Sequence, residues 1–266
     1  MKQRHSYDFD QFNDSNRTDE LKRLEKQATI GQQFEKELLQ RLGIPETGQL
    51  VEVGCGPGFV TGLIGSMFTD ASVLGMDNST EMISVANKVV KPVHPNVEFI
   101  QGDAYTTPLQ DNSTDLVYGR MLYQHLSNPI KAAEEAMRIL KPEGQLCVVD
   151  VDAGFQFIEP PCEAFDRLNQ LAGEAQKTYG GDRYIGRKLP HIMQSAGFTD
   201  IRFQTITVSS LDIPLEEYLT ITTRFKAMLV GTSEAENLMD QVLEHCQQQP
   251  TPLLMVGIIA CVGRKP

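Results

Sequence analysis

The chain has 266 residues, of which 41% are apolar and 22% are charged, enough for one large α/β domain or a domain with a cap. Its net charge of −11, without any basic run, argues against binding to nucleic acid, which requires clustered Lys and Arg. The five cysteines form no C-x-x-C pair, which indicates reduced thiols and no zinc or other metal site.

No segment has the pattern of a signal peptide or a membrane span. The first residues are polar, and the longest apolar stretch, 253–262, is too short to cross a bilayer as a helix. We therefore expect a cytoplasmic protein that does not engage a membrane. The sequence gives no indication of its oligomeric state.

In chain order, polar residues 1–19 precede a predicted amphipathic helix over 20–42, which Gly43 and Pro45 end. Strand and helix signals then alternate as far as residue 151. The strands are predicted at 49–53, 72–77, 97–101, 114–118 and 144–151, with helices between them. This βαβ rhythm predicts a parallel sheet with helices on both faces.

The C-terminal half is less regular than the first. Helices are predicted at 162–179, 187–196, 215–228 and 233–247, and strands at 201–209 and 254–264. We interpret the chain as a single domain, 1–266, whose core comprises about 43–152, 187–210 and 251–266. Residues 1–42, 153–186 and 211–250 are then candidate cap elements.

A glycine turn, VEVGCGPG over residues 51–58, follows the first predicted strand. Glycines tolerate positive φ and let a ligand lie against bare backbone, and ligands bind at this end of strands in open α/β sheets. Glu52 lies inside a buried strand and therefore needs a hydrogen-bonding role. The spacing is not that of a dinucleotide fingerprint, because Phe59 occupies the third glycine position, and no Lys-Ser/Thr pair follows as a P-loop requires.

Acidic residues follow the next two predicted strands. Asp77 lies about 20 residues past the glycine turn, where a carboxylate can accept both hydroxyls of a ribose, or can instead cap a helix. Asn78 is a plausible cap of the next helix, with Glu81 three residues later. Asp103, in the segment 102–104, can accept from an adenine amino group or can form a solvated turn.

Together with DLV at 115–117 and LKPEG at 140–144, these motifs resemble the class I S-adenosylmethionine-dependent methyltransferases, in particular their small-molecule branch, which includes ubiquinone- and natural-product-type enzymes. The resemblance covers residues 49–151 well and the C-terminal third loosely. It implies an α/β fold with a Rossmann-like, mostly parallel seven-stranded sheet, helices on both faces, and N-terminal and C-terminal helical cap elements. It also implies S-adenosyl-L-methionine as cofactor, S-adenosyl-L-homocysteine as product and a small-molecule substrate.

The resemblance further implies the cofactor site. Gly54, Gly56 and Gly58 would flank the methionine part of the cofactor. Asp77 would hold the ribose, and Asp103 with Ala104 would meet the adenine. The other residues expected at the cofactor are Glu52, Cys55, Asn78, Met82, Gly102, Arg120 and Met121, with Arg120 contributing a backbone contact.

The predicted N-terminal helix resembles a lead-in helix that closes over the cofactor in some of these enzymes. Arg23 would suit the methionine carboxylate as a bidentate pair, the alternative being a solvated helix face. Tyr7 is a candidate to close this lid.

His125 is the candidate catalytic residue, because it could face the acceptor and act as a base, the alternative being a packing role. Asp150 and Asp152 end the fifth predicted strand at the ligand edge of the sheet. Alternation places both on one face, where one touches the acceptor or both are exposed to solvent. We take Asp152 and Tyr184 as candidate substrate-binding residues.

The implied reaction is in-line displacement at the sulfonium methyl, for which the protein aligns the acceptor and excludes water. O- or N-methylation is favoured over C-methylation. Two alternatives stay open. One is a nicotinamide-dependent oxidoreductase, against which Phe59 and Glu52 count. The other is a cofactor-binding protein that is not a transferase, such as a regulatory subunit or a cyclase.

Overall fold

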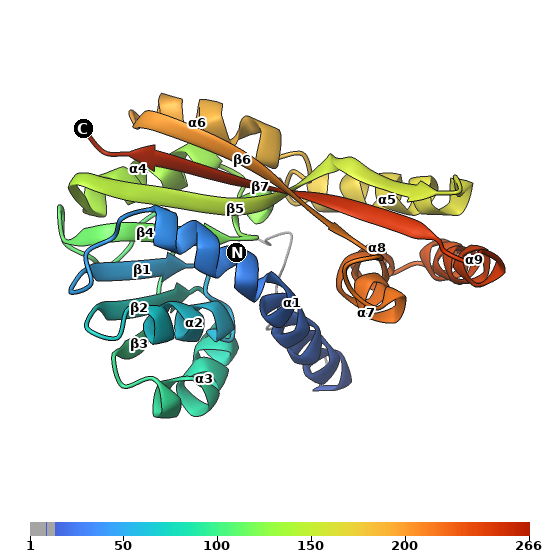
Figure 1. Ribbon diagram of the computed structural model, residues 1–266, viewed down its shortest axis with the longest axis horizontal. Coiled ribbons are helices and arrows are strands. Elements are labelled where there is room, and N and C mark those ends of the chain that lie inside the picture. The colour runs from blue at the N-terminus through green and yellow to red at the C-terminus, as the bar shows by residue number, and fades with distance from the viewer. Residues whose placement is uncertain (1–8, 10–13) are drawn as a thin grey trace.

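The computed structural model describes Phe9 and residues 14–266. Seven strands form one sheet in the order β3-β2-β1-β4-β5-β7-β6, with β7 antiparallel to both of its neighbours (Figure 1). The strands are β1 (Gln49–Val53), β2 (Ser72–Asp77), β3 (Val97–Gln101), β4 (Thr114–Arg120), β5 (Leu140–Glu159), β6 (Thr199–Ser209) and β7 (Leu253–Arg264). The predicted Rossmann-like fold class is confirmed.

Helices cover both faces of this sheet. The α-helices are α1 (Asp14–Arg41), α2 (Phe59–Met67), α3 (Thr80–Val89), α4 (Pro129–Ile139), α5 (Glu163–Lys177), α6 (Leu189–Ser195), α7 (Leu215–Leu219), α8 (Phe225–Val230) and α9 (Ser233–Gln248). Short 3-10 turns are η2 (Lys91–Val93), η3 (Tyr123–His125) and η4 (Gly186–Lys188), and η5 (Thr220–Arg224) is a π turn.

Alternate residues of β1 serve two different cores. Leu50 packs in one cluster with side chains of α1, α2 and α3, whereas Val51 packs in another with side chains of α4 and α6. Successive side chains of a strand point to opposite faces, so a strand covered by helices on both sides is apolar throughout. This explains why the first strand reads as a continuous apolar run interrupted only by Glu52.

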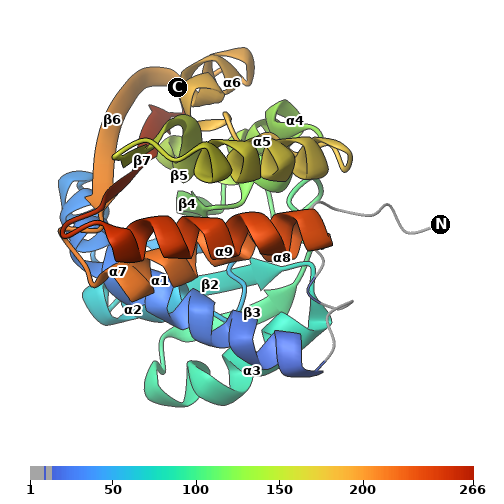
Figure 2. The ribbon, with the colours of Figure 1, turned by 90° about the vertical axis from the view of Figure 1, so that its right-hand side faces the viewer.

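Helices α5, α7, α8 and α9, called the cap from here on, share a hydrophobic cluster. It lies at the end of the sheet where β5 and β7 extend beyond the other strands (Figure 1). Phe165 of α5, Tyr218 of α7 and Val242 of α9 are buried there, together with Leu254 of β7. Figure 2 shows α9 across this end of the molecule, near α5 and α8. The space between this cap and the sheet is where the candidate site lies.

The structure corrects several predicted boundaries. Helix α1 begins at Asp14 rather than at residue 20, since the apolar periodicity that predicted it starts only at Leu21. Strand β5 runs on to Glu159, because an irregularity between Asp152 and Gln156 lets it resume pairing with β7. The helix predicted over 215–228 contains the π turn η5, a feature that recurs at functional sites.

The other composition-based expectations concern membranes and cysteines. Across the described residues, none of the helices has both the length and the apolar character needed to cross a bilayer. All five cysteines are free and buried.

Candidate active site

A cavity of about 610 Å³ lies at the carboxyl ends of β1, β2 and β4, bounded by α1 and by the cap. Residues from the turn after β1 and from the loops after β2, β3 and β4 line its sheet side. It brings together most of the residues predicted from sequence, namely Arg23, Glu52, Gly54, Cys55, Gly56, Asp77, Asn78, Met82, Gly102, Asp103, Ala104, Arg120, Met121 and His125.

The glycines of the turn divide into two roles. Gly56 has φ +53, and a Cβ placed on it would find no described atom within 4 Å, so its backbone faces open space. Gly58 has φ +82, and a Cβ there would lie 2.6 Å from the Phe99 ring. Gly58 does not line the cavity. Its predicted cofactor contact is therefore replaced by a packing role, in which it lets α2 approach β3.

Asp77 holds this turn in place. Its Oδ2 accepts a hydrogen bond of 2.8 Å from the Gly56 amide, and its Oδ1 accepts one of 2.9 Å from the Ser79 amide. The cap of α3 is Ser79, not Asn78 as predicted, because the Ser79 Oγ accepts from the Met82 amide at 3.1 Å. Asn78 is left at the cavity wall.

Glu52 is a buried acid in the cavity wall. Its Oε2 accepts a hydrogen bond of 2.5 Å from the Thr61 hydroxyl. Burial raises the pKa of Glu52 to about 8, and this outweighs the stabilising bond from Thr61. Burial therefore favours the protonated form of Glu52, and a cation in the cavity would favour its ionised form.

A buried ion pair joins α1 to the end of β4. The Arg120 guanidinium pairs with Glu35, and its Nη2 donates to the Gln27 carbonyl at 3.1 Å. Gly31 makes room for it, since a Cβ there would lie 2.8 Å from that Nη2. Sequence reasoning missed Glu35. The signal was the stripe of Gln27, Gly31 and Glu35, which are spaced four residues apart and so share one helix face.

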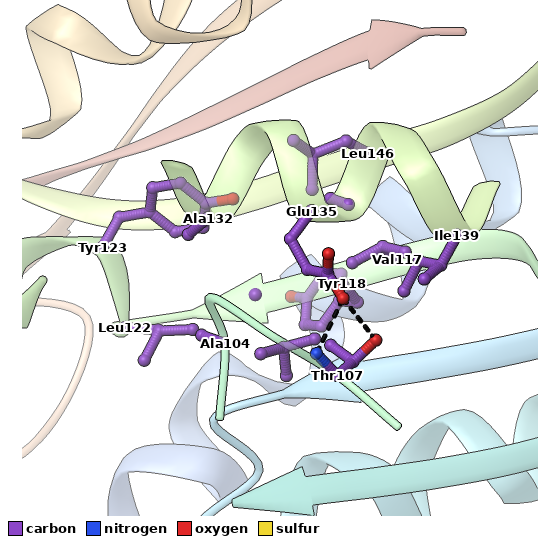
Figure 3. Close-up of a pocket in the computed structure, with 13 residues that line it drawn as sticks. Ala104, Thr107, Val117, Tyr118, Leu122, Tyr123, Ala132, Glu135, Ile139 and Leu146 are labelled. Atoms are coloured by element: carbon purple, nitrogen blue, oxygen red, sulfur yellow. Dashed lines mark hydrogen bonds between the residues drawn. The ribbon is translucent and has the colours of Figure 1, made fainter. Parts of the chain in front are cut away.

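The loop that carries Asp103 is tied to α4 (Figure 3). Glu135 of α4 accepts from both the amide and the hydroxyl of Thr107, each at 2.7 Å. The small cavity beside this pair has a volume of about 10 Å³ and is no ligand site. Asp103 itself accepts from the Tyr105 amide at 2.7 Å, so it forms the local turn considered above while also lining the large cavity.

Arg23 lines the cavity but has a partner within its own helix. Its Nε and Nη2 each donate to Glu20 at 2.7 Å, and its guanidinium lies 4.5 Å from the centre of the Phe225 ring. In this arrangement the bidentate edge that was expected to bind a methionine carboxylate is occupied by Glu20. Tyr7, the other predicted lid residue, lies outside the described residues.

His125 lies in the cavity wall, next to a buried glutamine. The Gln176 amide nitrogen is 3.5 Å from its Nδ1. Burial, and after it the charges of Arg183 and Arg23, lower the pKa of His125 to about 3. A general base works best with a pKa near the operating pH, so the predicted base role is not supported by this environment.

Asp152 and Tyr184 are not brought to the cavity. Asp152 accepts from Arg187 at 2.7 and 2.6 Å, and Tyr184 is 47% exposed at the surface. Asp150 accepts from the Gln124 amide at 3.1 Å and thereby holds the loop after β4. Both aspartates are fully buried, so the alternative that both are exposed to solvent is also wrong. Each instead accepts hydrogen bonds from donors within the protein.

The cap side of the cavity consists of residues that sequence reasoning missed. They come from separate parts of β5, β6, β7, η5, α8 and the loop before η4, and they include Gln156, Arg183, Val208, Ile221, Phe225, Val256 and Ile258. No motif links them, because each of these elements contributes only one or two side chains.

Comparison with known proteins agrees with this geometry. Residues 51–148 match a family described as methyltransferase domain. Trans-aconitate 2-methyltransferase of Variovorax paradoxus is 33% identical over 113 residues, 42% of each chain. A 37.1 kDa protein in transposon TN4556 of Streptomyces fradiae is 30% identical over 183 residues, 68% of this chain and 52% of the relative. The chain spans about half the length of the curated relatives it matches.

Among solved structures, phosphoethanolamine N-methyltransferase 2 of Haemonchus contortus, in complex with phosphomonomethylethanolamine and S-adenosylhomocysteine, has a TM-score of 0.57 and 25% identity, over 86% of this chain and 52% of that one. The YcgJ protein from Bacillus subtilis has a TM-score of 0.61 at 19% identity, over 86% and 96% of the two chains, and shares the fold.

The strand order, the glycine turn at the cavity and the match over residues 51–148 agree on one class of protein. Residues 51–148 form a methyltransferase domain, and the chain is similar to S-adenosylmethionine-dependent methyltransferases of known structure. The nicotinamide-dependent alternative is thereby set aside.

Proposed function

We propose that this protein transfers a methyl group from S-adenosylmethionine to a small-molecule acceptor held against the cap. One observation carries the proposal. A single cavity of about 610 Å³ joins the glycine turn and Asp77 on the sheet side to the side chains of the cap. Relatives named for trans-aconitate and phosphoethanolamine support a small acceptor.

The residues on the sheet side fit the cofactor. Glu52, Asp77 and Asp103 supply carboxyl groups, which suit ribose hydroxyls, amino groups and a nearby positive charge. The open space beside Gly56 lets a ligand lie on bare backbone. Bound S-adenosylmethionine supplies a methyl group already activated on its sulfonium.

The remaining work of the protein is to position the acceptor and exclude water. Helix α1, fixed by the Glu35–Arg120 pair, and the π turn η5 close the cavity from two sides. Ile221, Phe225 and Ile258 give the acceptor an apolar wall. Since His125 is a weak base here, we favour acceptors whose nucleophile has a lone pair available at neutral pH, an oxygen or a nitrogen rather than a carbon.

The test is transfer of radiolabel from methyl-tritiated S-adenosylmethionine to a panel of small carboxylic acids, amines and phenols. The proposal predicts label in an extractable product with at least one acceptor class, and its loss in Asp77→Ala. Tight binding of S-adenosylhomocysteine without transfer to any acceptor would instead favour a regulatory subunit or a cyclase.

A further inference from the structure

Two buried cationic groups lie at the cap end of the cavity. Arg183, in the loop between α5 and η4, is 7% exposed and lines the cavity. Lys226 of α8 is 1% exposed, and its Nζ donates at 2.9 Å to the Oε1 of Gln156, which also lines the cavity. Arg183 lies on the side of the cavity that the cofactor motifs leave unused, and Lys226 does not line the cavity but is bonded to Gln156, which does.

Neither group has a carboxylate within 4.0 Å in the part of the chain that the structure describes. Arg183 donates from Nη1 to the Gln176 Oε1 at 3.3 Å, whereas its Nε has no hydrogen-bond partner. The carboxylate next in sequence, Asp182, is instead paired with Lys188 at 2.5 Å. A buried guanidinium with an unused donor is costly unless a ligand supplies an acceptor.

The charge of Asp150 acts on Arg183, but the Asp150 oxygens accept hydrogen bonds from backbone amides. It accepts from the amides of Gln124 and Val151, and it does not line the cavity. Burial and the charge of Arg183 hold the pKa of Lys226 well below its usual range. An anion in the cavity beside Arg183 would supply the acceptor that its Nε lacks.

The orientation of Arg183 fits a carboxylate. Its Nη1 is held by Gln176, a fully buried residue of α5 whose own Nε2 donates to the Gln124 carbonyl at 2.7 Å. The Nε, on the other edge of the guanidinium, is buried and has no hydrogen-bond partner among the described residues, and arginine binds carboxylates with two parallel hydrogen bonds from one edge. Gln176 thus acts as a positioning residue.

The surroundings define the rest of the ligand. Val208, Ile221, Phe225, Val256 and Ile258 line the cavity from the cap strands and helices. The carboxylates of the cavity wall, Glu52, Asp77 and Asp103, come from the ends of β1, β2 and β3. Arg23 and Arg120 also line the cavity, but each is paired with a carboxylate, Glu20 and Glu35 respectively, whereas Arg183 at the cap end forms no ion pair with a described residue.

We propose that the cap end is a carboxylate-recognition site centred on Arg183, which makes the acceptor an acid with an apolar body. That the bound acid is the methyl acceptor rests on the function proposed above. The site itself rests only on Arg183, Gln176 and the apolar wall, so its test does not require methyl transfer.

The experiment compares benzoate with benzamide, which have the same shape and differ in charge. Binding of each radiolabelled probe to the full chain is measured by equilibrium dialysis at fixed ionic strength, with and without saturating S-adenosylhomocysteine. We expect benzoate to bind about tenfold or more tightly than benzamide, the scale of hydrogen bonds to a charged group. Equal binding of the two probes would overturn the site, and this comparison needs no variant.

Two variants then test whether Arg183 is the residue that favours benzoate over benzamide. Arg183→Met should abolish this preference, while Arg167→Met, which removes an exposed arginine paired with Glu234 at 3.0 Å, should leave it intact. A preference that survives in Arg183→Met overturns the assignment to Arg183. Failure of S-adenosylhomocysteine to bind would count against the proposed function alone, because the arm without it still supports or overturns the carboxylate site.

Discussion

Gly56 and Asp77, 21 residues apart, are joined by a hydrogen bond of 2.8 Å from the glycine amide to the aspartate Oδ2. The carboxylate at the end of β2 therefore shapes the turn after β1 before any ligand arrives. Asp77 was interpreted as either a ribose ligand or a helix cap. Its bond to Gly56 adds a third role, since it aligns the backbone on which the cofactor is expected to lie.

Asp77→Asn should weaken S-adenosylhomocysteine binding by about 2 kcal/mol, the scale for losing hydrogen bonds to a charged acceptor. The amide keeps the volume but loses one acceptor oxygen. Calorimetric titration measures the change, and Asp70→Asn, at an exposed turn before β2, is the matched control. An affinity equal to that of the unchanged protein would remove Asp77 from the site.

Alanine should mainly reduce stability at Gly58 and mainly weaken cofactor binding at Gly56. Gly58→Ala forces a Cβ to 2.6 Å from the Phe99 ring at φ +82, so we expect a loss in the free energy of unfolding of about 2–4 kcal/mol. Gly56→Ala meets no described atom within 4 Å at φ +53, so it should cost only about 1–2 kcal/mol but weaken cofactor binding. Urea unfolding and calorimetry separate the two, and the reverse order would contradict this account of the turn.

Glu35→Gln should destabilise the protein by about 3–5 kcal/mol, because it leaves the Arg120 guanidinium buried without its counter-charge. Glu37→Gln, two residues along the same helix, removes only a half-exposed pair with Arg41 and should change stability by less than about 0.5 kcal/mol. Urea unfolding of both variants is the measurement. Equal stability of the two would show that α1 is not fixed to β4 by this pair.

Titration of Glu52 should lower the free energy of unfolding as pH rises. Burial raises the pKa of Glu52 in the folded protein to about 8, from an ordinary value of 4.5. Between these values the folded state holds a proton that the unfolded state has released. The stabilising contribution is therefore complete below about pH 4.5 and is lost as pH rises through 8.

The Glu52→Gln variant isolates this effect, since glutamine keeps the shape without titrating. Urea unfolding at pH 5, 7 and 9 should show the unchanged protein losing stability relative to the variant at each step. A difference between the two proteins that stays constant with pH would mean that Glu52 titrates normally.

The sheet and the cofactor half of the site could be predicted because they depend on local signals. Apolar strands, the glycines after β1 and the acids after β2 and β3 are close in sequence to the structures they form. The cap half depends on long-range packing. Lys226 and Gln156 meet because β5 continues past Asp152 and α8 lies against it.

The same reason explains the errors at particular residues. Asp152 looked like a ligand at the end of a strand, but Arg187, 35 residues later, returns to pair with it. Glu35 was not predicted as a site residue, but Arg120 lies against it. In both cases the partner's position could not be inferred from spacing.

The most direct measurement is calorimetric titration of the purified protein with S-adenosylhomocysteine and, in parallel, with a nicotinamide dinucleotide. The cavity described here predicts one-to-one, micromolar binding of S-adenosylhomocysteine, lost in Asp77→Ala, and no binding of the dinucleotide. Binding of the dinucleotide alone would contradict the assignment of this cavity to S-adenosylmethionine.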